Sequence, residues 1–155
     1  MKFYLDCEFN GFGGELISLA LVSSDLEYAF YEVVPHEGLV LNPWVEEHVI
    51  PVLYRKPKDS IEGFKHKLAM FLREHAVNNH LTIVADWPED IKYFCEALIT
   101  GPGMASITPN ITFEMDRTGL VDTSEYSALP HNALEDARAL ALFASSESVA
   151  PDPRF

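Results

Sequence analysis

The sequence predicts an α/β protein in which helices cover a mixed β-sheet. Two observations predict this class. Strand patterns follow one another through residue 34, and amphipathic helices with a short apolar strand between them occupy much of the rest. Three successive strands joined by short turns are typical of an antiparallel meander, and the whole order of elements then gives a mixed sheet covered by helices.

The first strand is predicted over residues 2–9, because its side chains alternate between two faces. One face carries Phe3, Leu5, Cys7 and Phe9, and the other carries Tyr4, Asp6 and Glu8. A flexible, glycine-rich turn over 10–14 leads to a buried second strand over 15–23. A tight turn at Ser24-Asp25 then leads to a third strand over 27–34.

Helix signals follow the three strands. Asn42 is a cap with proline at the first helical position, so a short helix is expected through about Val49, with Pro51 as its end. Ser60 caps a longer helix, whose apolar residues recur at helical spacing as far as His75.

The second half of the chain predicts four further elements. Residues 81–85 predict a short strand, and the apolar spacing over 91–98 predicts an amphipathic helix that ends at the glycine-proline-glycine segment 101–103. One strand is expected near 111–115, and a final helix over about 133–146.

The length of 155 residues suggests a single domain, expected over residues 1–147 with a C-terminal tail over 148–155. No apolar run approaches the roughly 20 residues that cross a bilayer, and Asp6 comes too early for a signal peptide. We therefore expect a cytoplasmic protein that does not span a membrane.

Cys7 and Cys95 make no disulfide framework, and their spacing is not that of a zinc site.

The net charge of −13 argues against a protein that holds nucleic acid by a broad basic surface. It does not exclude an enzyme that uses divalent metal ions to hold a short polyanion. The sequence has neither the Gly-x-Ser-x-Gly turn of serine hydrolases nor a Walker-type phosphate loop. The candidate chemistry therefore lies with the acidic residues.

Two acidic groups stand at the first strand and at a helix start. Asp6 and Glu8 share one strand face, roughly 7 Å apart at Cα, and a divalent cation between them would offset the cost of burying two charges. The alternative is that Asp6 and Glu8 lie at a solvated strand end and bind no cation.

Asp86 and Glu89 fit a capping box, which places Asp90 one turn inside the helix with its carboxylate facing the protein. Alternatively, Asp90 only complements the helix dipole.

The last helix begins in a similar way. Asn132 and Glu135 form a second capping-box pattern, and Asp136 lies one turn inside the helix. His131 stands in the loop before this cap, where its imidazole and the Asp136 carboxylate can share one site; a purely structural histidine is the alternative. Four acids and one histidine thus stand where oxygen ligands for two hard cations can converge.

These residues resemble the DEDDh exonucleases of the RNase T-like superfamily, and within it the small 3′→5′ exoribonucleases of the RNase AS type. The resemblance is carried by Asp6-Cys7-Glu8-Phe9, Glu15-Leu16-Ile17-Ser18, the segment 43–51 and the segment 131–138. It implies an RNase H-like fold with a five-stranded mixed sheet flanked by helices, two Mg²⁺ or Mn²⁺ ions, single-stranded 3′ ends as substrate with RNA favoured, and a homodimer.

The resemblance also implies roles for the candidate residues. One metal ion, held by Asp6, Glu8 and Asp136, would bind the attacking water, and a second, held by Asp6 and Asp90, would stabilise the leaving 3′ oxygen. Neutral His131 would act as general base in a hydrolysis that releases nucleoside 5′-monophosphates. The histidine-asparagine pair that precedes the third acid in many members is absent, and Asp86 stands near its place. Asp86 is therefore the alternative to Asp90 as third acid.

Aromatic and basic residues near these motifs are candidates for substrate contacts. A terminal base could stack on an aromatic ring, with plain packing as the alternative; the candidates are Phe9, Phe12, Trp44 and Trp87. The Trp44/His48 pair fits contact with substrate, contact with a dimer partner, or packing. Arg138 and Lys92 fit either phosphate contacts or surface ion pairs. With so few basic residues, we expect contact with only a few terminal nucleotides.

Two other functions stay open at this point. The first is a metal-dependent phosphohydrolase of small nucleotides, which the acidic charge favours. The second is a non-catalytic module of the same fold that binds nucleic acid or protein.

Overall fold

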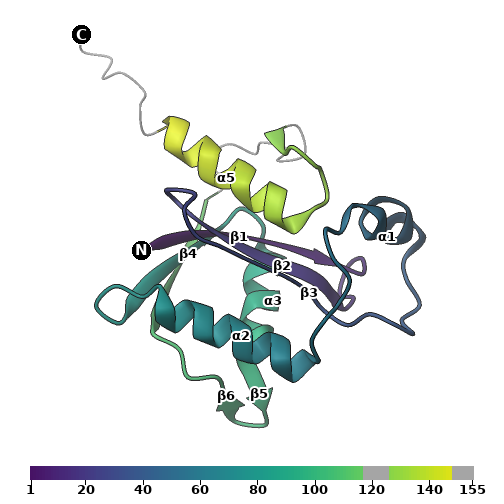
Figure 1. Cartoon of the computed structure of the whole chain (residues 1–155), viewed down its shortest axis with the longest axis horizontal. Coiled ribbons are helices and arrows are strands. Elements are labelled where there is room, and N and C mark those ends of the chain that lie inside the picture. Colours follow the sequence, from purple (N-terminus) through teal and green to yellow (C-terminus); the bar gives the residue numbers. More distant parts are fainter. Residues whose placement is uncertain (117–125, 148–155) are drawn as a thin grey trace.

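In a computed structural model of the protein, which describes residues 1–116 and 126–147, five strands form one mixed sheet in the order β3-β2-β1-β4-β7 (Figure 1). β1, β2 and β3 pair antiparallel, while β4 pairs parallel with both β1 and β7. The strands are β1 (Lys2–Phe9), β2 (Leu16–Ser23), β3 (Ala29–Val33), β4 (His80–Ala85) and β7 (Asn110–Met115). The predicted α/β class, the mixed sheet and its antiparallel opening are confirmed.

Helices pack on both faces of this sheet. They are α1 (Pro43–His48), α2 (Ile61–Glu74), α3 (Pro88–Leu98) and α5 (Ala133–Glu147), with the 3-10 turn η1 (Ile50–Val52) after α1. Phe3 and Leu5 of β1 join the apolar core that includes α2 and α3, whereas Tyr4 joins a second core with α5. In Figure 1, α5 accordingly lies on one side of the sheet and α2 on the other. The predicted alternation of β1 is therefore confirmed, and the face that carries Asp6 and Glu8 is directed toward α5.

Two helix starts are capped as predicted. The side-chain oxygen of Asn42 accepts a hydrogen bond from the Trp44 N–H at 2.9 Å, and that of Ser60 accepts one from the Gly63 N–H at 3.1 Å. Each cap satisfies a backbone donor that the first helical turn would otherwise leave without a partner.

The predicted cap of α3 is wrong. α3 begins at Pro88, and its N-cap is Trp87 rather than Asp86. Proline has no N–H to satisfy and a φ already suited to a helix, so it takes the first helical position and makes the residue before it the cap. Asp86 consequently stands one residue outside the position that the capping box requires.

Two predicted helix ends also differ in the structure. Pro51 does not end α1 but lies inside η1. α3 ends earlier, at Leu98, and the 101–103 segment forms the turn of a small hairpin. The strands of this hairpin are β5 (Ile99–Gly101) and β6 (Met104–Ala105).

The C-terminal tail expected over 148–155 lies outside the described residues. Within residues 1–116 and 126–147, none of the helices combines the length and the apolar character that crossing a membrane requires.

Candidate metal site

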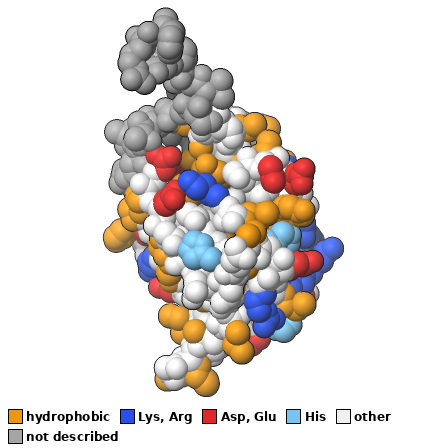
Figure 2. Space-filling model, turned by 90° about the vertical axis from the view of Figure 1, so that its left-hand side faces the viewer, with side chains coloured by type: hydrophobic (Ala, Val, Ile, Leu, Met, Phe, Trp, Pro, Cys, Tyr) orange, Lys and Arg blue, Asp and Glu red, His pale blue; other side chains and the backbone are white. Residues whose placement is uncertain are grey.

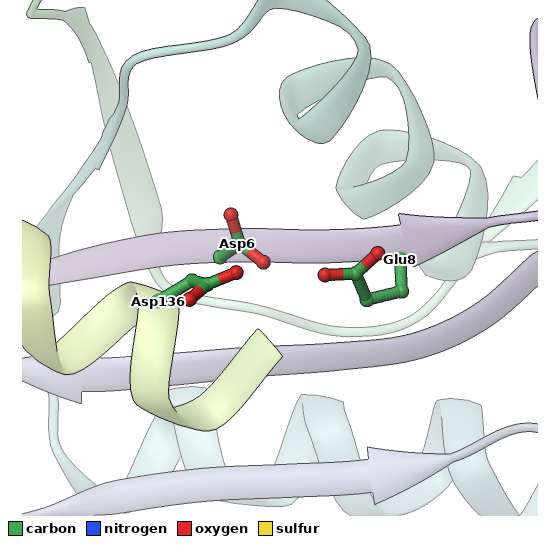
Figure 3. A group of neighbouring side chains, drawn as sticks. All are labelled: Asp6, Glu8 and Asp136. Carbon is green, nitrogen blue, oxygen red and sulfur yellow. The ribbon is translucent and has the colours of Figure 1, made fainter. Parts of the chain in front are cut away.

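β1 and α5 bring three carboxylates together. Asp6 and Glu8 project from the same face of β1, and Asp136 projects from the first turn of α5 toward them (Figure 3). Each offers a carboxylate oxygen, and these three oxygens lie within 4.8 Å of one another. We call Asp6, Glu8 and Asp136 the acidic trio. It arises because a strand repeats its face every two residues and α5 packs directly on that face.

The start of α5 is fixed in a way that holds Asp136 in place. The side-chain oxygen of Asn132 accepts hydrogen bonds from the N–H groups of Leu134 and Glu135, at 3.1 and 3.3 Å. The side-chain amide of Asn132 donates to the carbonyl oxygen of Val52 at 2.8 Å, which ties the helix start to η1. The predicted cap by Asn132 is thus confirmed, and it sets the direction in which the first turn of α5 points.

Burial of the acidic trio leaves two of its oxygens without a partner. Asp6 Oδ2 and Asp136 Oδ1 are buried, and among the described residues neither accepts a hydrogen bond. A buried polar atom without a partner costs free energy, and a divalent cation would offset that cost. The donor set consists of carboxylates alone, which suits a hard cation such as Mg²⁺ or Mn²⁺.

Burial and mutual repulsion raise the pKa values of the trio. Burial is the largest cause for Asp6, whose pKa lies well above its usual value, followed by the charges of Asp90 and Glu8. Burial and the Asp136 charge raise the pKa of Glu8 to about 8. Burial also raises the pKa of Asp136, against a hydrogen bond from Ser127 that lowers it. Without a cation Glu8 therefore retains its proton near neutral pH, and a cation bound by the trio would release it.

Asp90 lies beside the trio and is not a member of it. Its side chain in the first turn of α3 is only 2% exposed, as the sequence predicted for a carboxylate facing the protein. Burial and the charge of Asp86 raise the pKa of Asp90 to about 8. Among neighbouring charges, that of Asp90 raises the pKa of Asp6 the most. Asp90 and Asp86 line the same cavity as the trio, so both remain candidates for the third acid.

Asp116 is an acidic residue of this cavity that the sequence analysis missed. β4 and β7 run parallel with Ala85 opposite Met115, so Asp86 and Asp116 leave the sheet at the same edge. The Asp116 N–H donates to the Ala85 carbonyl oxygen at 2.9 Å, and both aspartates line the cavity. The sequence did contain a signal for this position, because Asp86 directly follows β4 and Asp116 directly follows β7.

The trio opens into a cavity of about 790 Å³. Part of its wall is aromatic and apolar, and Trp44 and Trp87, each 48% exposed, contribute to it. Among the described residues, no lysine or arginine lines this cavity. On the face of the molecule in Figure 2, lysine and arginine side chains are separated by acidic, histidine and hydrophobic ones. Positive charge for a polyanion would therefore have to come largely from bound metal ions.

His131 lines the cavity and directly precedes Asn132, the cap of α5. Its backbone φ is +64°, in the left-handed region that few residue types adopt readily. Its backbone N–H donates to Asp136 Oδ2 at 3.1 Å, and the charge of its imidazole lowers the pKa of Asp136. The structure thus brings His131 next to Asp136, as the spacing of the two residues suggested.

The other aromatic candidates differ in position. Phe9, Trp44 and Trp87 line the cavity, whereas Phe12 is 97% exposed and is not among the lining residues. Phe9 also stacks on Tyr93 with ring centroids 4.8 Å apart. Phe9 therefore combines packing with a place in the cavity wall.

Glu135 does not complete the predicted capping box. Its carboxylate accepts hydrogen bonds from the Tyr54 hydroxyl at 2.9 Å and from the guanidinium of Arg138. Arg138 is therefore held in an ion pair, and Lys92 forms another with Glu96 at 3.8 Å. These pairs agree with the interpretation of Arg138 and Lys92 as members of surface ion pairs rather than as phosphate contacts.

Comparison of the chain with protein-family models and with curated proteins finds no match in either set.

Proposed function

We propose that this protein is a metal-dependent 3′→5′ exonuclease with an RNase H-like fold, acting on single-stranded 3′ ends, with RNA favoured. The observation that carries the proposal is the pair of buried, unpartnered carboxylate oxygens on Asp6 and Asp136, in a cavity that His131 also lines. The motif resemblance supports the same function, and it adds the expectation of a homodimer.

The acidic trio fits a divalent cation by charge, by donor type and by the closeness of its three oxygens. Asp90 and Asp86, which line the same cavity and whose charges raise the pKa of Asp6, are the candidates to hold a second cation with Asp6. When bound, such ions would activate water and stabilise the negative charge that develops on the phosphate.

The chain's own residues would orient and deprotonate the water. In the proposed hydrolysis, His131 takes a proton from a water molecule whose oxygen attacks the terminal phosphorus. The bond from phosphorus to the 3′ oxygen of the preceding nucleotide breaks, and that oxygen takes a proton from solvent. The products are a nucleoside 5′-monophosphate and a chain shortened by one nucleotide, and the proton on His131 is released to solvent.

The acidic wall of the cavity limits how much of a nucleic acid the protein contacts. Because no lysine or arginine of the described residues lines the cavity, few phosphates would be neutralised by side chains. Binding should therefore weaken only slightly as salt rises, since a steep salt dependence reflects many phosphate contacts. The same observation favours a second candidate function, hydrolysis of small nucleotides.

The deciding experiment uses purified protein, Mn²⁺ and a 5′-labelled oligoribonucleotide. We expect a ladder that shortens from the 3′ end, and loss of that ladder in Asp6→Asn. A DNA oligomer of the same sequence and a mononucleotide phosphoester, tested in parallel, separate RNA hydrolysis from the alternatives. Metal-dependent thermal stabilisation without hydrolysis of any of these substrates would instead support a non-catalytic module.

A further inference from the structure

Three aromatic rings meet at the wall of the cavity. The indole of Trp44 contacts the imidazole of His131 edge to face, with ring centroids 4.8 Å apart and an interplanar angle of 78°. The indole also stacks on the imidazole of His48, at 4.7 Å and 11°. We call Trp44, His48 and His131 the aromatic cluster. Both contacts have the separations and angles that aromatic pairs prefer.

The position of Trp44 within this cluster is determined by the turn after β1. The side chain of Asn10 accepts a hydrogen bond from the Asn42 N–H at 2.7 Å, and the Asn42 side chain caps α1 through the Trp44 N–H. One turn later, Nδ1 of His48 lies 3.0 Å from the Trp44 carbonyl oxygen. A carbonyl oxygen only accepts, so this Nδ1 carries a proton and the His48 ring is fixed against the indole.

Within residues 1–116 and 126–147, by contrast, the side chain of His131 forms no hydrogen bond, and its backbone forms one. Its N–H donates to Asp136 Oδ2. Among the described residues, its ring makes aromatic contacts with Trp44 and His48, the second at 6.4 Å between centroids. A histidine ring on a loop has several rotamers available, so the indole restricts its direction more than the backbone bond does.

We propose that Trp44 is a positioning residue, which holds the imidazole of His131 toward the acidic trio. The inference rests on the proposed function, in which His131 takes the proton of the attacking water. A general base has to stand within hydrogen-bond reach of that water, and a misplacement of about 1 Å can cost on the order of 100-fold in rate.

This role differs from that of a stacking platform for a base. One face of the indole is already covered by His48 and the indole also contacts His131, so the groups it orients belong to the protein itself. A platform would act on substrate affinity and hence on KM. A positioning residue would act on kcat, with metal affinity retained.

The chain offers a matched control for Trp44. Trp87 lines the same cavity and has the same exposure of 48%, and its indole N–H donates to Glu89 at 3.2 Å. Trp44 is half exposed, whereas its neighbour Val45 supplies the buried contact of α1. Trp44→Ala therefore removes the indole without opening the core, and Trp44→Phe keeps a ring in its place.

The experiment measures the His131 ring directly and then measures turnover. In the metal-free protein, the signals of His131 are assigned by NMR through their loss in His131→Gln. Loss of the indole ring current shifts these signals in any case, so the readout is the Hα–Hβ couplings, which report the rotamer of His131. Trp44→Ala should average these couplings over several rotamers, while Trp87→Ala should leave them unchanged. In the Mn²⁺-loaded protein, Trp44→Ala should lower kcat by about 10–100-fold with little change in KM. Trp44→Phe should recover most of the loss, and Mn²⁺ affinity should match that of the unmodified protein in both variants.

Two outcomes would overturn the inference. Unchanged Hα–Hβ couplings of His131 in Trp44→Ala would mean that the indole does not hold the ring. A raised KM with unchanged kcat would assign Trp44 to substrate binding instead. If the unmodified protein hydrolyses nothing, the proposed function fails, and the NMR comparison still decides whether Trp44 positions His131.

Discussion

Two helix starts with nearly the same sequence pattern contribute differently to the cavity. α3 begins within Asp86-Trp87-Pro88-Glu89-Asp90, and α5 begins within Asn132-Ala133-Leu134-Glu135-Asp136. In both, a polar residue is followed by glutamate three positions later and by aspartate four positions later. Nevertheless, Asp136 belongs to the acidic trio, whereas Asp90 lies beside it.

The difference begins at Pro88. Proline takes the first helical position of α3, so its cap is Trp87 and Asp90 stands at the third helical position. In α5 the cap is Asn132, and Asp136 stands at the fourth position. One residue corresponds to about 100° around a helix of 3.6 residues per turn. Two aspartates with equal spacing from their polar partners therefore point in different directions.

The two helices also approach β1 from opposite layers. Residues of α3 pack into the core that contains Phe3 and Leu5, and residues of α5 pack into the core that contains Tyr4. Only α5 therefore lies over the face of β1 that carries Asp6 and Glu8. A common polar pattern at a helix start does not by itself specify which face of the sheet the helix will cover.

The largest expected difference between the two helix starts concerns metal binding. Asp136→Asn should abolish tight Mn²⁺ binding and reduce hydrolysis to the level of the metal-free protein, because it removes one of three converging ligands. Asp90→Asn should weaken binding of a second ion while the first still binds. Isothermal titration with Mn²⁺ measures both, with Glu96→Gln on the exposed side of α3 as control. Equal losses in the two aspartate variants would contradict the distinction between trio and neighbour.

The next effect concerns His131, which precedes the cap of α5. His131→Ala should lower kcat by about 10²–10⁴-fold, the usual contribution of general base catalysis. Mn²⁺ affinity should be retained, because the ring is not a member of the trio. Single-turnover hydrolysis of the labelled oligoribonucleotide measures the rate. Full activity in His131→Ala would exclude it from the mechanism.

The raised pKa values predict how stability depends on pH. Native Glu8 and Asp90 hold their protons up to about pH 8, whereas in the unfolded chain carboxyls lose theirs above roughly pH 4. The native state therefore binds more protons in this window, so the metal-free protein should lose stability as pH rises from about 4 to 8.

Thermal unfolding across this pH range checks the expectation. Mn²⁺ should remove most of the decline, because it binds the deprotonated carboxylates. Asp90→Asn should flatten the decline in the metal-free protein, since it removes one of the groups responsible. A metal-free melting temperature that rises steadily from pH 5 to 8 would show that these carboxyls are ionised in the native state.

The smallest expected effect is a difference in unfolding free energy between variants at the starts of α5 and α3. Asn132→Ala should cost about 1–2 kcal/mol of unfolding free energy, because it removes the cap of α5 together with the hydrogen bond to Val52. Asp86→Ala should not incur this capping cost, since Trp87 is the N-cap of α3. Urea unfolding of both variants compares them. A loss of the same size in Asp86→Ala would mean that Asp86 supports the start of α3 after all.

The sequence was most informative where one local rule decides the outcome. The alternation of β1 places Asp6 and Glu8 on one face, and the Asn42, Ser60 and Asn132 caps mark the starts of their helices. These features depend on neighbours two to four residues away, and the structure agrees with each of them.

The features that sequence analysis missed depend on distant partners. Glu135 bonds with Tyr54 and Arg138 rather than with its own cap, because η1 and the chain after it pack near α5. Asp116 reaches the cavity only because β7 pairs with β4 in a register that aligns their ends. The contact between Trp44 and His131 joins residues 87 positions apart, and no pattern along the chain predicts it.

The left-handed backbone at His131 makes chemical rescue possible. Glycine adopts a positive φ without steric cost, so His131→Gly keeps the amide that donates to Asp136 and vacates the volume of the ring. Free imidazole added to this variant should enter from the cavity and restore part of the hydrolysis. Alanine, which tolerates a φ of +64° poorly, should respond less. Rescue by imidazole would thus separate two roles of residue 131: the hydrogen bond from its backbone N–H to Asp136, and the proton transfer by its ring.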